Sequence, residues 1–234
     1  ISTTSSTLPH FPKASIIIAT YNQLEFLRKN IQSIEKNTIY PNFEIIIITN
    51  NNDKTSPIRK FLKTIEYQVI YYDDEYSFSN VNNFAAKEAT GDFLLFLNDD
   101  VEIITPNWLD DMLKLCIQKN TGAVGSKLLF PDGTLQEAGG IIWKDGSIWN
   151  YGRNKNSDDF NYNFVRKVDY CSGSCLMIKK ELFEKINGFD PIYHPAYCED
   201  ADLCLTLQQM GFDILYQPKS VLIHHEGSTS SNST

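Results

Sequence analysis

The sequence feature that most constrains the fold is a run of five apolar residues, 93–97, that ends directly in Asn98, Asp99 and Asp100. The run is short, uncharged and preceded closely by a glycine, which is typical of a strand buried on both faces, as in a parallel sheet. The polar side chains are then expected at the carboxyl end of that strand, where open α/β sheets bind ligands. Because adjacent carboxylates repel each other, a divalent cation that bridges them to an anionic substrate would explain them. The alternative is an Asx-type turn, since Asn and Asp favour turns for local reasons.

The first hundred residues repeat this pattern of an apolar strand followed by an amphipathic helix. Strands are expected at residues 14–19, 43–49, 67–72 and 92–97, and helices at 23–36, 56–64 and 79–89. This alternation predicts right-handed crossovers and a mostly parallel sheet. The polar residues after the first, second and fourth strands should therefore lie along one edge of the sheet.

The second half of the chain is less regular. Helices are expected at 106–117, 180–186 and 200–210, strands at 123–130 and 214–216, and a strand, loop and strand at 168–179. We predict one domain over residues 13–226, between a linker-like start at 1–12 and a Ser-rich mobile tail at 227–234. The chain does not begin with Met, and we expect it to be part of a larger, multidomain protein.

Composition excludes several classes of protein. The net charge of −8 and the absence of a basic stripe argue against a nucleic-acid-binding surface. No window approaches the roughly 18 apolar residues that span a bilayer. Five cysteines, an odd number, favour reduced thiols and a cytoplasmic location over a disulfide framework. Cys171 and Cys175 lack a second pair at the spacing of a structural zinc site.

The polar residues at the first two strand ends suit a nucleotide. Tyr21 can stack or hydrogen-bond, and Asn50 and Asn52 offer donors and acceptors to a base. Neither G-x-G-x-x-G nor G-x4-G-K-[ST] occurs, which disfavours dehydrogenases and P-loop enzymes and leaves phosphate neutralisation to a cation. The alternative for the Asn cluster is a polar loop.

Four segments, in this order and spacing, resemble the family-2 glycosyltransferases of the GT-A fold. They are ASIIIATYN at 14–22, EIIIITNNN at 44–52, NDD at 98–100 and EDADL at 199–203. The resemblance extends over about residues 14–225. The segments PDGTLQEAGG at 131–140 and LIHHE at 222–226 are most similar to bacterial members that build rhamnose-containing or O-antigen-type polysaccharides. The fold that this implies is α/β, a mostly parallel central sheet with flanking helices and a smaller antiparallel sheet on the acceptor side.

The resemblance also implies a reaction. It predicts an inverting hexosyl- or deoxyhexosyltransferase that uses Mn or Mg and moves a sugar from a UDP or dTDP donor to a saccharide or lipid-linked saccharide acceptor. Bacterial surface polysaccharide synthesis would place the protein in the cytoplasm. A lipid-linked acceptor is compatible with peripheral association at the inner face of the membrane, although the charge pattern does not demand it.

The family pattern assigns roles at the donor and metal site. The segment 98–100 corresponds to the D-x-D motif with Asn in place of the first Asp; Asp100 is the expected metal ligand and Asp99 the contact to ribose or sugar. His224 is the expected second ligand, with His225 left open. The alternative for either histidine is a core or exposed residue with an ordinary hydrogen bond. Donor contacts are expected from Thr20, Tyr21, Asn22, Asn50, Asn52, Asn83, Asn98 and Asp99.

The carboxylates of Glu199, Asp200 and Asp202 open a predicted helix, at the positive end of its dipole. Helix capping alone is the alternative explanation. In the family pattern Asp200 is the general base, which takes the acceptor's proton on the face opposite the leaving diphosphate. Glu199 is the second choice, and Asp202 is expected to orient the loop or the acceptor.

Two further segments are expected near the sugars. The loop Ser172, Gly173 and Ser174 matches a family loop beside the donor sugar and the acceptor; a simple bulge between strands is the alternative. Three aromatic residues could form a stacking platform for an acceptor sugar, with core or lid packing as the alternative. They are Trp143, Trp149 and Tyr151.

Two other functions compete with this interpretation. A nucleotidyltransferase also places carboxylates at the ends of parallel strands, but it needs a Gly-rich, basic phosphate loop that this chain lacks. A catalytically silent nucleotide- or glycan-binding module of a larger polymerase would fit the linker-like start and Asn98.

Overall fold

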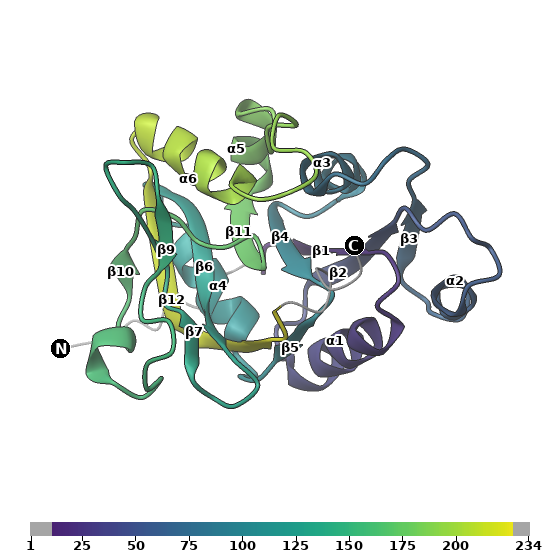
Figure 1. Cartoon of the computed structure of the whole chain (residues 1–234), viewed down its shortest axis with the longest axis horizontal. Helices are drawn as coiled ribbons and strands as arrows, with labels where there is room; N and C mark the ends of the chain where they lie inside the picture. Colours follow the sequence, from purple (N-terminus) through teal and green to yellow (C-terminus); the bar gives the residue numbers. More distant parts are fainter. Residues whose placement is uncertain (1–10, 227–234) are drawn as a thin grey trace.

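The computed structural model describes residues 11–226, which form a ten-stranded mixed sheet flanked by helices and a separate two-stranded sheet (Figure 1). The predicted linker at 1–12 and the predicted tail at 227–234 lie largely outside the described residues. The main sheet has the strand order β10-β12-β6-β11-β4-β1-β2-β3, with β5 paired to β12 and β7 to β6. Within residues 11–226, no helix has both the length and the apolar character needed to cross a bilayer.

The first half of the chain forms the parallel part of the sheet, as predicted. Its strands are β1 (Ala14–Thr20), β2 (Phe43–Thr49), β3 (Gln68–Tyr71) and β4 (Phe93–Asn98), and its helices are α1 (Leu24–Asn37), α2 (Pro57–Leu62) and α3 (Phe78–Glu88). In the register, Thr20 of β1 is paired with Thr49 of β2, and Ala19 with Asn98 of β4. The three polar strand ends therefore share one edge of the sheet, which confirms the expectation.

The second half adds three strands, one of which runs antiparallel to its neighbours. They are β6 (Thr121–Leu129), β11 (Cys175–Lys179) and β12 (Asp213–His224), and the helices are α4 (Trp108–Cys116), α5 (Lys180–Lys185) and α6 (Glu199–Gln209). β11 is antiparallel to both β4 and β6. β4 is thus buried on both faces, as predicted, but it is parallel to β1 and antiparallel to β11. The sequence did not predict this antiparallel neighbour, because a run of apolar residues indicates that a strand is buried and not which way its neighbours run.

Several elements escaped the sequence analysis because they are two or three residues long, too short for a hydrophobic period. They are β5 (Val101–Ile103), β7 (Leu135–Glu137), β8 (Gly140–Ile142), β9 (Ile148–Asn150), β10 (Arg166–Lys167) and the 3₁₀ turn Phe160–Tyr162. The strand expected at 214–216 is also longer, since β12 continues to His224 past a register shift between Gln217 and Val221. β8 and β9 form the small antiparallel sheet.

Two apolar layers cover the faces of the sheet. Alternate residues of β1 enter opposite layers, with Ile16 and Ile18 in one and Ile17 in the other. Helices α1, α2 and α4 contribute to the first layer, and α3, α5 and α6 to the second, on opposite sides of the sheet in Figure 1. The five cysteines are free thiols, as expected, and four of them are buried.

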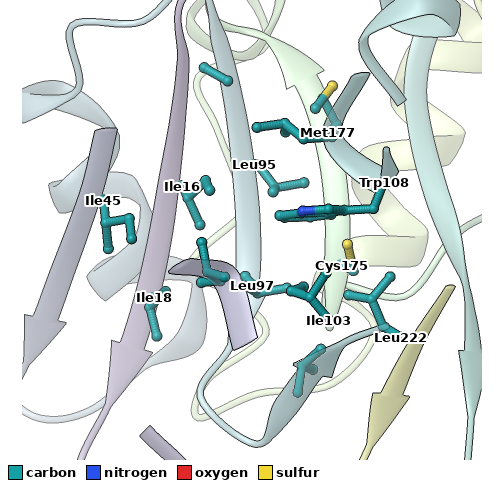
Figure 2. Packing of buried hydrophobic residues seen from close by; sticks show 14 of the residues in the cluster. Ile16, Ile18, Ile45, Leu95, Leu97, Ile103, Trp108, Cys175, Met177 and Leu222 are labelled. Atoms are coloured by element: carbon teal, nitrogen blue, oxygen red, sulfur yellow. The ribbon is translucent and has the colours of Figure 1, made fainter. Parts of the chain in front are cut away.

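Trp108 is the largest buried side chain of the first layer. Figure 2 shows its ring beside Leu95 of β4 and the β11 residues Cys175 and Met177. Its indole Nε1 donates a hydrogen bond to Thr38 Oγ1 at 2.9 Å. Trp108 therefore packs α4 against the junction of the parallel and antiparallel parts of the sheet.

We predict that Trp108→Ala lowers the free energy of unfolding by about 3–5 kcal/mol, because it leaves a large cavity at this junction. Urea denaturation measures the change. Trp149→Ala is the matched control, since the side chain of Trp149 is 60% exposed, and it should change stability by less than about 0.5 kcal/mol. Equal effects of the two substitutions would contradict this account of the core.

Candidate functional site

The two aspartates after β4 are buried at the shared edge of the sheet. Asp99 is 6% and Asp100 4% exposed. Thr20 Oγ1, at the end of β1, donates a 2.6 Å hydrogen bond to Asp99 Oδ2. Burial, reinforced by the charge of Asp100, raises the pKa of Asp99 to about 7. A turn that served only local needs would leave these carboxylates in water, so their burial favours a binding role.

His224 reaches the same place from the far end of the sequence. It ends β12, where it is paired with Val101 of β5, directly after the two aspartates. Its Nε2 lies 3.2 Å from Asp100 Oδ1. His225 faces elsewhere, with its Nε2 2.7 Å from Glu102 Oε1. His225 contacts Asp100 through the backbone, where His225 N donates to Asp100 O at 3.0 Å. The imidazole that faces the Asp100 carboxylate is therefore that of His224 and not that of His225.

The pair Asp100 and His224 fits a divalent cation that completes its coordination with substrate. Within the described part of the chain, no group of three or more His, Cys, Asp or Glu residues could hold a metal ion. Adjacent ligands of an octahedral ion at about 2.0–2.1 Å are about 3 Å apart, close to the 3.2 Å between Asp100 Oδ1 and His224 Nε2. A site with few protein ligands that leaves positions for phosphate oxygens and water is what Mg²⁺ ordinarily uses.

The carboxylate of Asp200 is fixed by backbone amides at the start of α6. Gly173 N donates to Asp200 Oδ2 at 2.9 Å, and Ala201 N donates to Oδ1 at 2.7 Å. Asp200 is not the N-cap residue, which is Cys198. Its bond to Ala201 N serves the first turn of α6, but its bond to Gly173 N reaches a loop outside the helix, which helix capping alone does not explain. Burial raises the pKa of Asp200.

Glu199, the first residue of α6, is buried, and its Oε2 has no hydrogen-bond partner among the described residues. Burial, together with the charge of Asp200, raises the pKa of Glu199 to about 7. Burial raises the pKa of the Tyr76 hydroxyl, before α3, and the charges of Asp99 and Glu199 add to this effect. The acidic groups at the ends of β4 and α6 therefore both act on Tyr76.

The loop 172–174 connects these two acidic ends. The backbone of Ser174 accepts from Asn98 N at 3.1 Å, and Ser174 Oγ accepts from Asn98 Nδ2 at 3.3 Å. On the other side of the loop, Gly173 N binds Asp200. A Cβ at Gly173 would lie 3.1 Å from the ring of Phe78, so a larger residue would fit there only if that ring moved. The loop is thus packed between strand β4 and helix α6.

Glu137 is a site residue that the sequence analysis missed. It lies in β7, is 1% exposed, and its Oε1 accepts from Ser172 N at 3.0 Å. Its Oε2 has no hydrogen-bond partner among residues 11–226. Burial is the main reason why its pKa rises to about 8, and the charge of Asp200 adds to it. Nothing in the pattern of a three-residue strand indicates such burial; the only signal is a lone Glu among apolar and Gly residues.

The residues expected to contact a nucleotide base lie at the ends of β1 and β2. Tyr21 and Asn22 are exposed, as is Asn52, whereas Asn50 Oδ1 is buried without a hydrogen-bond partner in the described structure. Asn51, which the sequence analysis did not select, is buried and donates through Nδ2 to Tyr21 O and Asn22 Oδ1. Asn51 therefore ties the two strand ends together.

Arg59 supports this side of the site from α2. It is 7% exposed, its Nη1 donates to Asn51 O at 2.8 Å, and its guanidinium lies 3.7 Å from the centre of the Tyr71 ring. The burial of Arg59 depends on tertiary contacts with Asn51, after β2, and with Tyr71 of β3. No local pattern in the sequence indicates it.

Two other predicted residues make mainly structural contacts. Asn83 Nδ2 donates to Phe189 O at 2.7 Å, and Asn83 Oδ1 accepts from Phe189 N at 2.9 Å, so both ends of its amide hold the segment before α6. Its contact to the donor stays a prediction. Asp202 Oδ1 accepts from Tyr193 Oη at 3.2 Å, which fits its expected role in orienting this loop.

The three aromatic residues considered as a stacking platform differ in their exposure and contacts. Trp143 and Trp149 are exposed on the β8–β9 hairpin. Tyr151 instead packs on Tyr162, with the Arg166 guanidinium 3.9 Å from its ring centre. A platform, if the acceptor uses one, is therefore limited to the two tryptophans.

We predict that Glu137→Gln flattens the dependence of stability on pH. A carboxyl whose pKa is higher in the folded protein binds its proton more tightly when folded, so its contribution to stability falls as pH rises from 4.5 to about 8. The substitution removes this loss, and it should show as a smaller decrease of Tm between about pH 5 and pH 8. Glu181→Gln, at an exposed position of α5, is the control. An unchanged slope in Glu137→Gln would show that Glu137 is not protonated by folding.

The sequence of the chain matches a known protein family. Residues 15–187 match the family model described as Glycosyl transferase family 2. The chain is 31% identical over 225 residues to the O-antigen biosynthesis protein RfbC of Myxococcus xanthus, covering 93% of this chain and 18% of that protein. It is 27% identical over 241 residues to the rhamnosyltransferase WbbL of Escherichia coli (strain K12), covering 90% of this chain and 82% of WbbL.

The chain is much shorter than some of these relatives. Besides 18% of RfbC, it spans 25% of the uncharacterized protein y4gI of Sinorhizobium fredii, to which it is 32% identical over 227 residues.

Two solved structures share the fold. A mannosyltransferase of Pyrobaculum calidifontis, solved with GDP-Man and Mn²⁺, has a TM-score of 0.70 at 17% identity and covers 94% of this chain and 59% of its own. GalNAc-T7, solved with UDP, GalNAc and Mn²⁺, has a TM-score of 0.75 at 16% identity and covers 92% of this chain and 45% of its own. These likenesses confirm the GT-A fold.

Proposed function

The chain belongs to glycosyl transferase family 2, and we propose that it transfers a sugar, with inversion, from a nucleoside diphosphate donor to a saccharide acceptor and depends on Mn²⁺ or Mg²⁺. The observation that carries the proposal is the 3.2 Å approach of Asp100 and His224, residues 124 positions apart, beside the carboxyl ends of β1 and β4. Two neighbouring buried ligands at a strand edge suit a cation held against a diphosphate.

The role proposed for each residue follows from its contacts. Asp100 and His224 would hold the cation, which when bound neutralises the charge of the leaving diphosphate. Asn98, Asp99 and the strand-end residues Thr20, Tyr21, Asn22, Asn50 and Asn52 would contact the donor. Thr20 supports this by holding Asp99 in one orientation through its hydrogen bond.

Asp200 is the proposed general base. As the acceptor oxygen bonds to the anomeric carbon and the bond to the diphosphate breaks, the acceptor's proton passes to Asp200. The hydrogen bonds from Gly173 N and Ala201 N occupy one lone pair on each carboxylate oxygen and leave the others available. The raised pKa of Asp200 makes it a stronger base than an exposed aspartate. Glu199 is the second choice for this role.

The biological setting is proposed from the relatives. RfbC is named an O-antigen biosynthesis protein and WbbL a rhamnosyltransferase. These names support a donor that carries a deoxyhexose on dTDP or UDP. They also support a saccharide or lipid-linked saccharide acceptor, in bacterial surface polysaccharide synthesis. The 18% coverage of RfbC supports a role as one part of a larger protein. Such an enzyme would work in the cytoplasm, at the inner face of the membrane when its acceptor is lipid-linked.

A panel of nucleotide sugars tests the function. Transfer or slow hydrolysis of one dTDP-, UDP- or GDP-linked sugar in the presence of Mn²⁺ would support a glycosyltransferase. Binding without turnover of any donor, with a range of saccharide acceptors present, would instead indicate a silent binding module.

We predict that Asp200→Asn lowers the rate of transfer by about 10²–10⁴-fold, because the amide cannot accept the proton. Donor binding with Mn²⁺ present, followed by calorimetry, should remain within a few-fold of the unsubstituted protein. Asp158→Asn, the same chemical change at an exposed position outside the proposed site, is the control and should retain most of the activity. Normal turnover by Asp200→Asn would remove this assignment.

We also predict that, as pH falls, transfer by the unsubstituted protein is lost before the ordinary pKa of aspartate is reached. A general base works only when deprotonated, and because burial raises the pKa of Asp200, its activity should be lost at a higher pH than that of an exposed aspartate. The acidic limb of the pH profile of kcat/KM measures this. A profile flat down to the ordinary pKa of aspartate would contradict it.

Metal dependence gives a separate prediction. Asp100→Asn and His224→Ala should each weaken Mn²⁺-dependent donor binding by about tenfold or more, since each removes one of two protein ligands. His225→Ala is the control, because His225 faces Glu102. Full donor binding in the presence of EDTA would contradict the metal site.

A further inference from the structure

We propose that Gln136 is a positioning residue for His224, which holds the imidazole ring so that Nε2 faces Asp100 and the cation. This inference rests on the proposed function, because it concerns the same metal site. Gln136 has no assigned role in the sequence pattern, and it precedes Glu137 in the short strand β7.

The contacts of Gln136 connect three groups. The residue is 1% exposed. Its Oε1 lies 2.7 Å from His224 Nδ1. Its Nε2 lies 3.2 Å from Glu226 Oε2 and 3.5 Å from the backbone oxygen of His224. Both polar ends of the amide are therefore used, and both bind the last residues of β12 or the turn after it.

These partners determine which way the amide points. A carboxylate and a carbonyl oxygen can only accept hydrogen bonds, so the NH₂ group of Gln136 must face Glu226 and His224 O. Arg153 Nη2 lies 2.6 Å from the same Oε2 of Glu226, so this oxygen accepts from the guanidinium as well as from the amide. The amide oxygen is then the atom left to face His224 Nδ1.

The orientation of the amide in turn determines the hydrogen on the ring. Since Gln136 Oε1 can only accept, His224 Nδ1 must carry a hydrogen, and in the neutral ring the lone pair is at Nε2. That lone pair faces Asp100 Oδ1 across 3.2 Å. Two acceptors at this distance repel unless a positive charge lies between them, so the arrangement prepares a ligand pair for a cation.

A hydrogen bond such as that between Gln136 and His224 commonly orients histidines that bind metals. An outer hydrogen bond to the second ring nitrogen fixes both the tautomer and the plane of the ring, and its loss typically weakens metal binding by about 10–100-fold. Here Gln136 supplies that hydrogen bond, and the pair of Glu226 and Arg153 fixes Gln136. Residues from β7, the turn after β12 and the segment after β9 thus act on one ring nitrogen.

The test substitutes Gln136→Met in the full chain, which keeps the approximate volume and removes the amide. Titration with MnCl₂ alone, followed by the electron paramagnetic resonance signal of free Mn²⁺, should show at least about tenfold weaker binding. The ¹⁵N shifts of the His224 ring provide a second measurement. They should show Nδ1–H as the dominant tautomer in the unsubstituted protein and a mixture of tautomers in Gln136→Met.

Gln217→Met is the matched control for a purely structural effect. Gln217 is also buried, at 4% exposure, and lies in β12, but within residues 11–226 its amide binds backbone atoms, Asp111 O and Lys219 N. It should lower Tm to a similar extent and leave the Mn²⁺ affinity unchanged.

A paired substitution keeps the proposal testable if Gln136→Met fails to fold. Gln136→Glu combined with Glu226→Gln exchanges the two groups, so that a carboxylate oxygen still accepts from His224 Nδ1 and an amide still donates across the pair. Mn²⁺ affinity within a few-fold of the unsubstituted protein would support the proposal. A tenfold or greater loss in this folded variant would overturn it.

The outcomes separate this proposal from the proposed function. Unchanged Mn²⁺ affinity and tautomer in folded Gln136→Met, with weakened binding in Asp100→Asn, would overturn the role of Gln136 alone. Unchanged affinity in Asp100→Asn as well would overturn the metal site itself.

Discussion

The antiparallel pairing of β11 with β4 is the constraint on which the rest of the site depends. Because β11 runs opposite to β4, its first residue, Cys175, is paired with Leu97 near the carboxyl end of β4. The loop before β11 therefore arrives at Asn98 and the two aspartates. A parallel strand in this place would bring its far end to that edge, and the loop that holds Asp200 would lie at the opposite side of the sheet.

The same loop makes the second half of the site possible. Its consecutive amides, Ser172 N and Gly173 N, each bind a carboxylate, Glu137 from β7 and Asp200 from α6. Four acidic residues consequently lie in or beside a region of low exposure, and burial raises the pKa of Asp99, Glu137, Glu199 and Asp200. Keeping these carboxyls out of water costs stability at neutral pH. Groups whose pKa values are shifted in this way cluster at functional sites, which supports the proposed roles of these carboxyls.

The parts of this structure that local patterns describe were predicted from the sequence. The β-branched and apolar runs of β1, β2 and β4, each followed by a helical stripe, were enough to predict the parallel half and the shared edge of polar residues. Motif order then indicated Asp100, His224 and Asp200, and the first two of these do lie together. The short strands were missed, since two or three residues do not define a period, and with them Gln136 and Glu137. Arg59 and Asn51 were missed because their burial comes from packing between elements.

The sequence by itself determined which segments are buried strands and amphipathic helices, and which residue types stand at their ends, because these depend on the spacing of apolar and polar side chains along the chain. The tertiary structure alone decided the direction of β11, the choice of His224 over His225 beside Asp100, and the grouping of Gln136, Glu226 and Arg153 behind that histidine. These features are contacts between residues far apart in the chain. Their geometry depends on strand register and on side-chain orientation, neither of which has a local period in the sequence.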